Sequence, residues 1–164
     1  MTELQSALIG NSAAAPPAHI IEGLEDAIAH QRIEGAPHTI YEELWHAAFW
    51  QLLALDWIEG VESSYPVHNE ESFPDTADVT AETWPALAER FLAGANQSAA
   101  IAGDQGRLDN VVRCTDKPGL PIRKKSVRDL LESTAAHNQY HLGRIVLLRQ
   151  LLKTWPPPSG GETW

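Results

Sequence analysis

Residues 126–152, SVRDLLESTAAHNQYHLGRIVLLRQLL, carry the clearest helical pattern in the chain. Ser126, followed three residues later by Asp129, is a typical helix start, because the serine side chain can accept from a free amide of the first turn. Prolines at 156–158 break the run. Residues that recur at spacings of three and four would lie on one face of the helix. They are Val127, Leu130, Leu131, Thr134, His137, Asn138, His141, Ile145, Leu148 and Leu152. This stretch predicts a long helix with one side in a core.

Three more segments have helical periodicity. The first is expected to begin after Pro16 and Pro17 and to end near residues 35–37. The second, residues 39–58, opens with a capping box of Thr39 and Glu42 and is apolar almost all round, as a central helix is. The third runs from about residue 83 to residue 102.

The connections between these segments complete the expected fold. Residues 59–79 are long enough to carry the chain from one end of a bundle to the other. Residues 111–113 and 120–123, with Pro118 and Gly119 between them, could pair as a short hairpin. The sequence therefore predicts an all-α protein, a four-helix bundle forming a single domain over residues 1–164, with at most one short hairpin before the last helix.

The composition excludes several classes of protein. The chain has 12 basic and 22 acidic residues, so nucleic acid is not an expected partner. Its one basic run, Arg123, Lys124, Lys125 and Arg128, is interpreted as a solvated loop. The lone Cys114 rules out an intrachain disulfide and is expected to be inert. No stretch approaches the roughly 20 apolar residues of a membrane span, and no secretory signal is recognisable, so a cytoplasmic location is expected.

Two histidines in the last helix are the best candidates for chemistry. His137 and His141 are four residues apart, so their rings lie on one helix face and could converge on a cation. The alternative is a pair of surface histidines, or of core histidines bonded to their neighbours. Asn138 stands where an HExxH protease has its glutamate, which excludes that class. His46, on the buried second helix, adds the third nitrogen that a three-histidine metal site requires.

The other ionisable residues near these positions are weaker candidates. Glu42 and Glu43 precede His46 and could orient a ligand ring, but capping the helix or facing solvent is the favoured interpretation for both. No general base is identifiable. The remaining histidines are interpreted as structural or incidental: His19, His30, His38 and His68. Only for His19 does a role in the site stay open.

These residues resemble a known family. The run HNQYHLGRI at 137–145, the segment ELWH at 43–46 and the entry LIG at 8–10 are similar to the DinB/YfiT-like proteins, also called YfiT-like metal-dependent hydrolases. Arg144 stands where the family often has glutamine. The resemblance covers nearly the whole chain, and the last helix is its most diagnostic part.

The resemblance implies a bundle of up-down-down-up topology and a homodimer. It also implies a metal, usually zinc or nickel and sometimes iron, bound by His46, His137 and His141. Characterised relatives include enzymes that use low-molecular-weight thiols.

Two reaction types stay open at this point, and so does a function without catalysis. Three imidazoles leave an ion with an open position, where it could activate water for hydrolysis or bind a thiolate for thiol transfer to a small molecule. The alternative is a non-catalytic, dimeric, metal- or ligand-binding bundle with a stress-related role.

Overall fold

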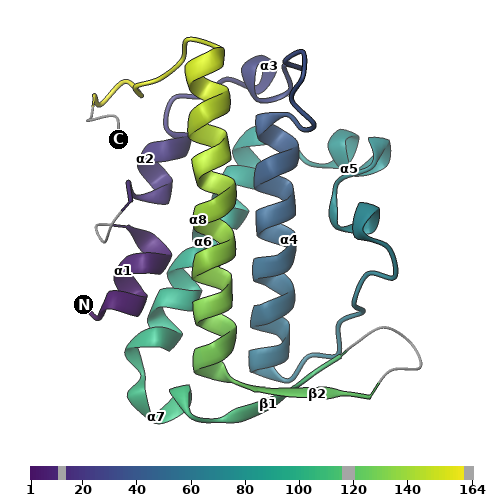
Figure 1. Ribbon diagram of the computed structural model, residues 1–164, viewed down its shortest axis with the longest axis vertical. Coiled ribbons are helices and arrows are strands. Elements are labelled where there is room, and N and C mark those ends of the chain that lie inside the picture. The colour runs from purple at the N-terminus through teal and green to yellow at the C-terminus, as the bar shows by residue number, and fades with distance from the viewer. Residues whose placement is uncertain (11–13, 116–120, 161–164) are drawn as a thin grey trace.

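The computed structural model describes residues 1–10, 14–115 and 121–160, and it is mostly helical with one small two-stranded sheet (Figure 1). The helices of the described residues are α1 (Glu3–Ile9), α2 (Pro17–Ile21), α3 (Asp26–Ala29), α4 (Ile40–Glu59), the 3-10 helix η1 (Asn69–Ser72), α5 (Thr76–Ala81), α6 (Trp84–Gly103), α7 (Gln105–Leu108) and α8 (Val127–Leu151). The strands are β1 (Val111–Cys114) and β2 (Arg123–Ser126).

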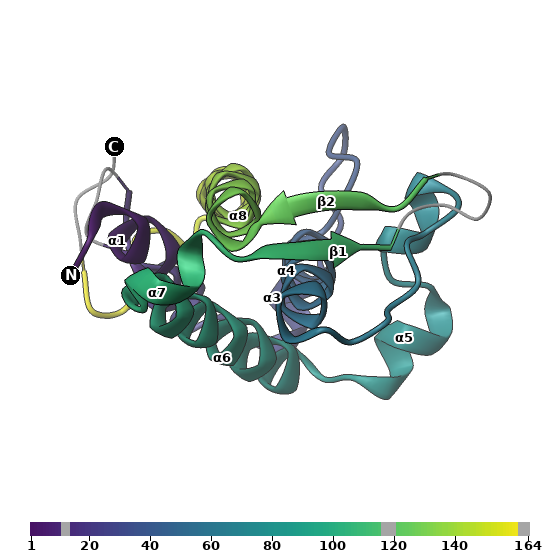
Figure 2. The same cartoon turned by 90° about the horizontal axis from the view of Figure 1, so that it is seen from below.

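The three long helices lie side by side, with α4 in contact with both α6 and α8 (Figures 1 and 2). Their starts follow the sequence signals. Thr39 accepts from the Glu42 amide at 3.2 Å, and Ser126 accepts from the Asp129 amide at 3.1 Å, so both predicted caps are confirmed. Pro85 lies in the first turn of α6, where its missing amide hydrogen leaves no bond unmade.

The N-terminal part of the prediction is wrong in two respects. The helix expected after Pro17 is interrupted, and α2 and α3 are separate short helices. Gly23, between them, has a φ of +67°, and a Cβ there would come within 2.6 Å of Pro158 Cγ, so the chain turns at this residue. In addition, α1 was not predicted, although Thr2 and Gln5 form a capping box at its start.

The connections also differ from the prediction in detail. Residues 59–79, expected as a long connection, also contain η1 and the start of α5. The hairpin exists, but Val111 pairs with Ser126 and Cys114 with Arg123, so the second strand lies later in the sequence than expected. The basic run was interpreted as a loop, but Arg123, Lys124 and Lys125 lie in β2, and Arg128 lies in the first turn of α8. The predicted turn at Pro118 and Gly119 lies outside the described residues.

The core consists of two apolar clusters stacked along the long helices. One contains the start of α4 and the end of α8, around Tyr41, Phe91 and Leu142. The other contains the end of α4 and the start of α8, and includes Cys114, which is fully buried as an inert cysteine should be. Buried polar residues, among them Gln51 and Asn138, lie on the same helices between these clusters. His137 and His141 are on the same stretch of α8, and His46 is beside the first cluster on α4.

Candidate metal centre

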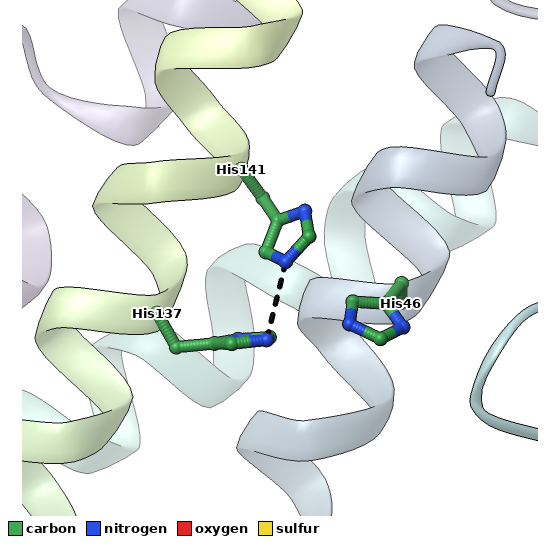
Figure 3. A group of neighbouring side chains, drawn as sticks. All are labelled: His46, His137 and His141. Carbon is green, nitrogen blue, oxygen red and sulfur yellow. Dashed lines mark hydrogen bonds between the residues drawn. The ribbon is translucent and has the colours of Figure 1, made fainter. Parts of the chain in front are cut away.

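The structure brings the three predicted histidines together. His46 lies on α4, and His137 and His141 lie on successive turns of α8, where the two helices pack against each other (Figure 3). One ring nitrogen from each residue can be chosen so that all three lie within 4.8 Å of one another. The ring centroids are 4.4 Å apart for His137 and His141 and 4.6 Å apart for His46 and His141. Imidazoles from two helices thus converge at one place.

Hydrogen bonds on the outer side of the cluster determine which nitrogen carries the proton. His46 Nδ1 lies 2.9 Å from the Ser72 carbonyl oxygen, in η1, and His141 Nδ1 lies 2.7 Å from Glu43 Oε2. Because a carbonyl and a carboxylate only accept, both Nδ1 atoms are assigned as donors. The Nε2 atom of each ring then has a free lone pair, which is the arrangement that metal-binding histidines require.

Glu43 is the residue whose position the sequence interpretation got wrong. Glu42 does cap its helix, accepting from the Thr39 amide at 2.8 Å. Glu43 is fully buried instead, and Arg144 Nη2 forms an ion pair with its Oε1 at 2.7 Å. One sequence signal was available, because Glu43 lies three residues before His46 and so on the same side of α4.

His137 supplies the observation by which a metal can be tested against the site. Its Nε2 lies 3.1 Å from Nε2 of His141, which is an acceptor, and its Nδ1 is buried with no hydrogen-bond partner among the described residues. In either tautomer, one nitrogen of this buried ring lacks an ordinary partner. When the proton is on Nδ1, the lone pairs of the two Nε2 atoms oppose each other, and a cation held between them would use both. The donor set therefore fits a divalent ion of the kind that imidazoles prefer, such as zinc, nickel or iron.

The protonation state of the cluster also suits a metal. Burial lowers the pKa of His46 to about 4, although the hydrogen bond to Ser72 opposes this shift. Burial also lowers the pKa of His137 to about 4, with further lowering from His141 and His46. Both rings are therefore neutral near pH 7, and only a neutral imidazole can donate a lone pair to an ion.

A pocket adjoins the cluster on the side of His137. It has a volume of about 230 Å³, and its lining includes Trp50, Trp57, Tyr65, Arg123, Lys125 and His137. Trp50 links the two features, because its ring centroid lies 6.2 Å from that of His46 and 6.4 Å from that of His137. A small molecule in this pocket would lie next to the histidines.

The other four histidines lie outside the cluster. His38 is half-buried rather than exposed, and it stacks on Phe73 with a centroid distance of 4.0 Å. Phe73 in turn stacks on His46 at 4.1 Å, so it is an apolar neighbour of the site that the sequence did not indicate. A role for His19 in the site was left open by the sequence, and the structure does not support it. His19 Nδ1 lies 3.2 Å from Ser159 Oγ in the C-terminal segment, away from the cluster. The residues outside are His19, His30, His38 and His68.

The part of the chain that the structure describes contains no helix with the combined length and apolar character needed to cross a membrane.

Comparison with known proteins gives one match. The model of the DinB superfamily matches residues 18–145, which include all three histidines, Glu43 and Arg144. Searches of curated proteins and of solved structures find no match. The family match covers most of the 164 residues, and it agrees with the resemblance found in the sequence. The chain belongs to the DinB superfamily.

Proposed function

We propose that this protein is a metal-dependent enzyme that acts on a small molecule, with His46, His137 and His141 holding a divalent ion. The observation that carries the proposal is the convergence of three imidazoles from two helices within 4.8 Å. We expect zinc or nickel, with iron as the third choice, because imidazole is a good ligand for all three.

The number of donors favours catalysis over a structural role. A structural zinc is bound by four protein ligands, whereas a catalytic ion keeps a position for water or substrate. Among the described residues, the cluster of metal-binding side chains contains three histidines and no fourth member. The nearby carboxylate of Glu43 is engaged by His141 and Arg144 instead. A substrate in the pocket beside His137 would lie next to the histidines that would hold the ion.

The ion would supply Lewis acidity, lowering the pKa of water or of a thiol at that position. The residues of the chain would position the ligand rings. Ser72 and Glu43 hold the His46 and His141 rings in place. The reaction is then hydrolysis, or transfer of a low-molecular-weight thiol to a second small molecule. Both reactions would use the same three histidines.

The proposed architecture is a single-domain four-helix bundle of up-down-down-up topology. The short helices α1 and α2 would together serve as its first helix, because α1 contacts both α6 and α8, and α2 contacts α8. The long helices α4, α6 and α8 would be the other three. We further propose that the enzyme is a cytoplasmic homodimer.

The test begins with protein purified without a histidine tag. Elemental analysis is expected to find about one zinc, nickel or iron per chain in this protein, and much less in a His137→Asn variant. A His68→Asn variant is the matched control, because His68 is exposed and outside the cluster. Wild-type protein without metal, after growth with these metals supplied, would contradict the proposal.

The second step separates an enzyme from a binding protein. The metal-loaded protein is assayed with an activated ester and, separately, with a thiol and an electrophilic acceptor, and thermal unfolding is followed before and after chelation. An enzyme predicts turnover of one substrate class and modest destabilisation after chelation. Loss of the fold on chelation, with turnover of neither class, would favour the non-catalytic metal-binding bundle.

A further inference from the structure

The pocket beside His137 has aromatic walls. The Trp50 and Tyr65 ring centroids are 5.2 Å apart, with the ring planes at 63°, and the Trp57 and Tyr65 rings are nearly parallel at 6.3 Å. Leu130 adds an aliphatic side chain to the same lining. Such surfaces favour a flat, apolar group over a fully polar one.

Two cations from the β-hairpin line the same pocket. Arg123 and Lys125 are two residues apart on β2, and alternate residues of a strand point to the same face. Lys124, between them, points to the other face and is not part of the lining. The Arg123 guanidinium lies 5.7 Å from the Tyr65 ring centroid, so it belongs to the aromatic wall as well as to the hairpin.

These cations are unusual in a chain with a formal net charge of -10. Half of its 12 basic residues fall within residues 113–128, a segment that includes the end of β1, the whole of β2 and the start of α8. No aspartate or glutamate is among the described residues that line the pocket. The charged residues of the described lining are therefore opposite in sign to the net charge of the protein.

We propose that the pocket selects a small amphipathic anion, with an apolar, preferably aromatic, body against Trp50, Trp57 and Tyr65. Its carboxylate, sulfonate or phosphate group pairs with Lys125 and Arg123. The rest of the molecule then extends towards His137, the lining residue that the pocket shares with the metal centre. Calling this anion a substrate rests on the proposed function, but its binding does not, because the cations belong to the hairpin and not to the histidine cluster.

The test is direct binding to metal-free protein, measured by isothermal titration calorimetry. The probes are 2-naphthoate, 2-naphthyl phosphate and the neutral 2-naphthamide. We expect at least one anion to bind about tenfold more tightly than the amide, as for a charge-assisted hydrogen bond that a neutral group cannot make. The two anions show whether the site prefers a carboxylate or a phosphate, and either preference supports the proposal.

Variants on β2 separate a specific contact from the general charge of the hairpin. Lys125→Gln and Arg123→Gln are expected to abolish the preference for the anion, while Lys124→Gln, with the same loss of charge, keeps it. Lys125→Arg is expected to retain binding, which shows the role of the charge even if the glutamine variant folds poorly. Equal binding of amide and anions, no binding of any probe, or an equal effect of Lys124→Gln would overturn the proposal.

The two proposals fail in different ways. Metal bound by the histidines without selective binding of an anion would leave the metal centre standing and overturn the pocket assignment. Selective anion binding in a protein that takes up no metal would support the pocket assignment and overturn the metal centre.

Discussion

Glu43 Oε2 lies 2.7 Å from His141 Nδ1, and both side chains are buried. This contact joins α4 to α8 immediately beside the point where the imidazoles meet. It holds the His141 ring with its Nε2 towards His137. A carboxylate behind a ligand histidine also makes the imidazole a stronger donor. The pair therefore links the packing of the two helices to the chemistry of the proposed site.

Glu43→Gln is expected to weaken metal binding about 10- to 100-fold, the usual effect of removing such a partner. The amide can still accept from His141 but has lost its charge. Competition titration with a chelator of known affinity measures the change. Glu42→Gln is the control, because Glu42 bonds to the Thr39 amide and its one histidine neighbour, His38 at 3.7 Å, lies outside the cluster. Its metal affinity is expected to match wild type. Unchanged affinity in the Glu43 variant would refute the role proposed for this carboxylate.

Arg144→Met is expected to destabilise the protein by about 1–3 kcal/mol, because Glu43 Oε1 would remain buried without its cation. Arg107→Met is the matched control. The two arginine side chains are similarly exposed, 31% and 36%, but the carboxylate partner is 0% exposed for Arg144 and 44% exposed for Arg107. Loss of the exposed pair should cost less than about 1 kcal/mol. Urea unfolding compares the two, and equal losses would contradict the importance of burial here.

The sequence predicted the parts of this structure that depend on local signals. The helices α4, α6 and α8 have caps or prolines at their starts and a regular apolar period, and they were found within one or two residues of their observed bounds. The interruption between α2 and α3 was not predicted. Gly23 has a positive φ there, and its approach to Pro158, far away in the sequence, leaves no room for a Cβ.

The difference between local signals and contacts between distant residues applies to the site as well. The spacing of His137 and His141 is local information, and it was sufficient to select them. The burial of Glu43 was missed, although its spacing from His46 is local information too, because α4 is apolar on almost every side and its composition does not show which face meets α8. The partners that keep Glu43 in the interior, His141 and Arg144, come from that other helix.

The metal-free protein is expected to lose stability as the pH falls from about 6.5 to about 4. The pKa of both His46 and His137 is lowered to about 4 by burial, whereas an unfolded chain binds these protons near pH 6.5. Between the two values the unfolded state takes up more protons, so the free energy of unfolding decreases, and the contribution of these groups is constant below about pH 4.

Urea unfolding of chelator-treated protein at a series of pH values measures this dependence. His46→Asn is expected to reduce the slope between about pH 6.5 and pH 4, because it removes one of the two groups. His68→Asn, at an exposed position, should leave the slope unchanged. A slope that is the same in all three proteins would show that these imidazoles do not resist protonation.

Gly94 allows α6 to approach a buried polar contact between the other two long helices. Gln51 donates to the Phe91 carbonyl oxygen at 2.9 Å and accepts from Asn138 Nδ2 at 2.8 Å, and both amide side chains are 2% exposed. A Cβ on Gly94 would overlap Gln51 Nε2. This bonded amide has to move if any side chain is added at position 94.

Gly94→Ala and Gly143→Ala are therefore expected to change stability in opposite directions, although both replace a glycine inside a long helix. Alanine improves helix propensity by about 1 kcal/mol at either position. At Gly143 a Cβ meets nothing within 4 Å, so the variant should be more stable by about that amount. At Gly94 the displaced Gln51 leaves buried groups unpaired at about 1–3 kcal/mol each, which exceeds the gain. Thermal unfolding of the two variants measures the difference, and stabilisation by both would show that Gln51 moves aside at little cost.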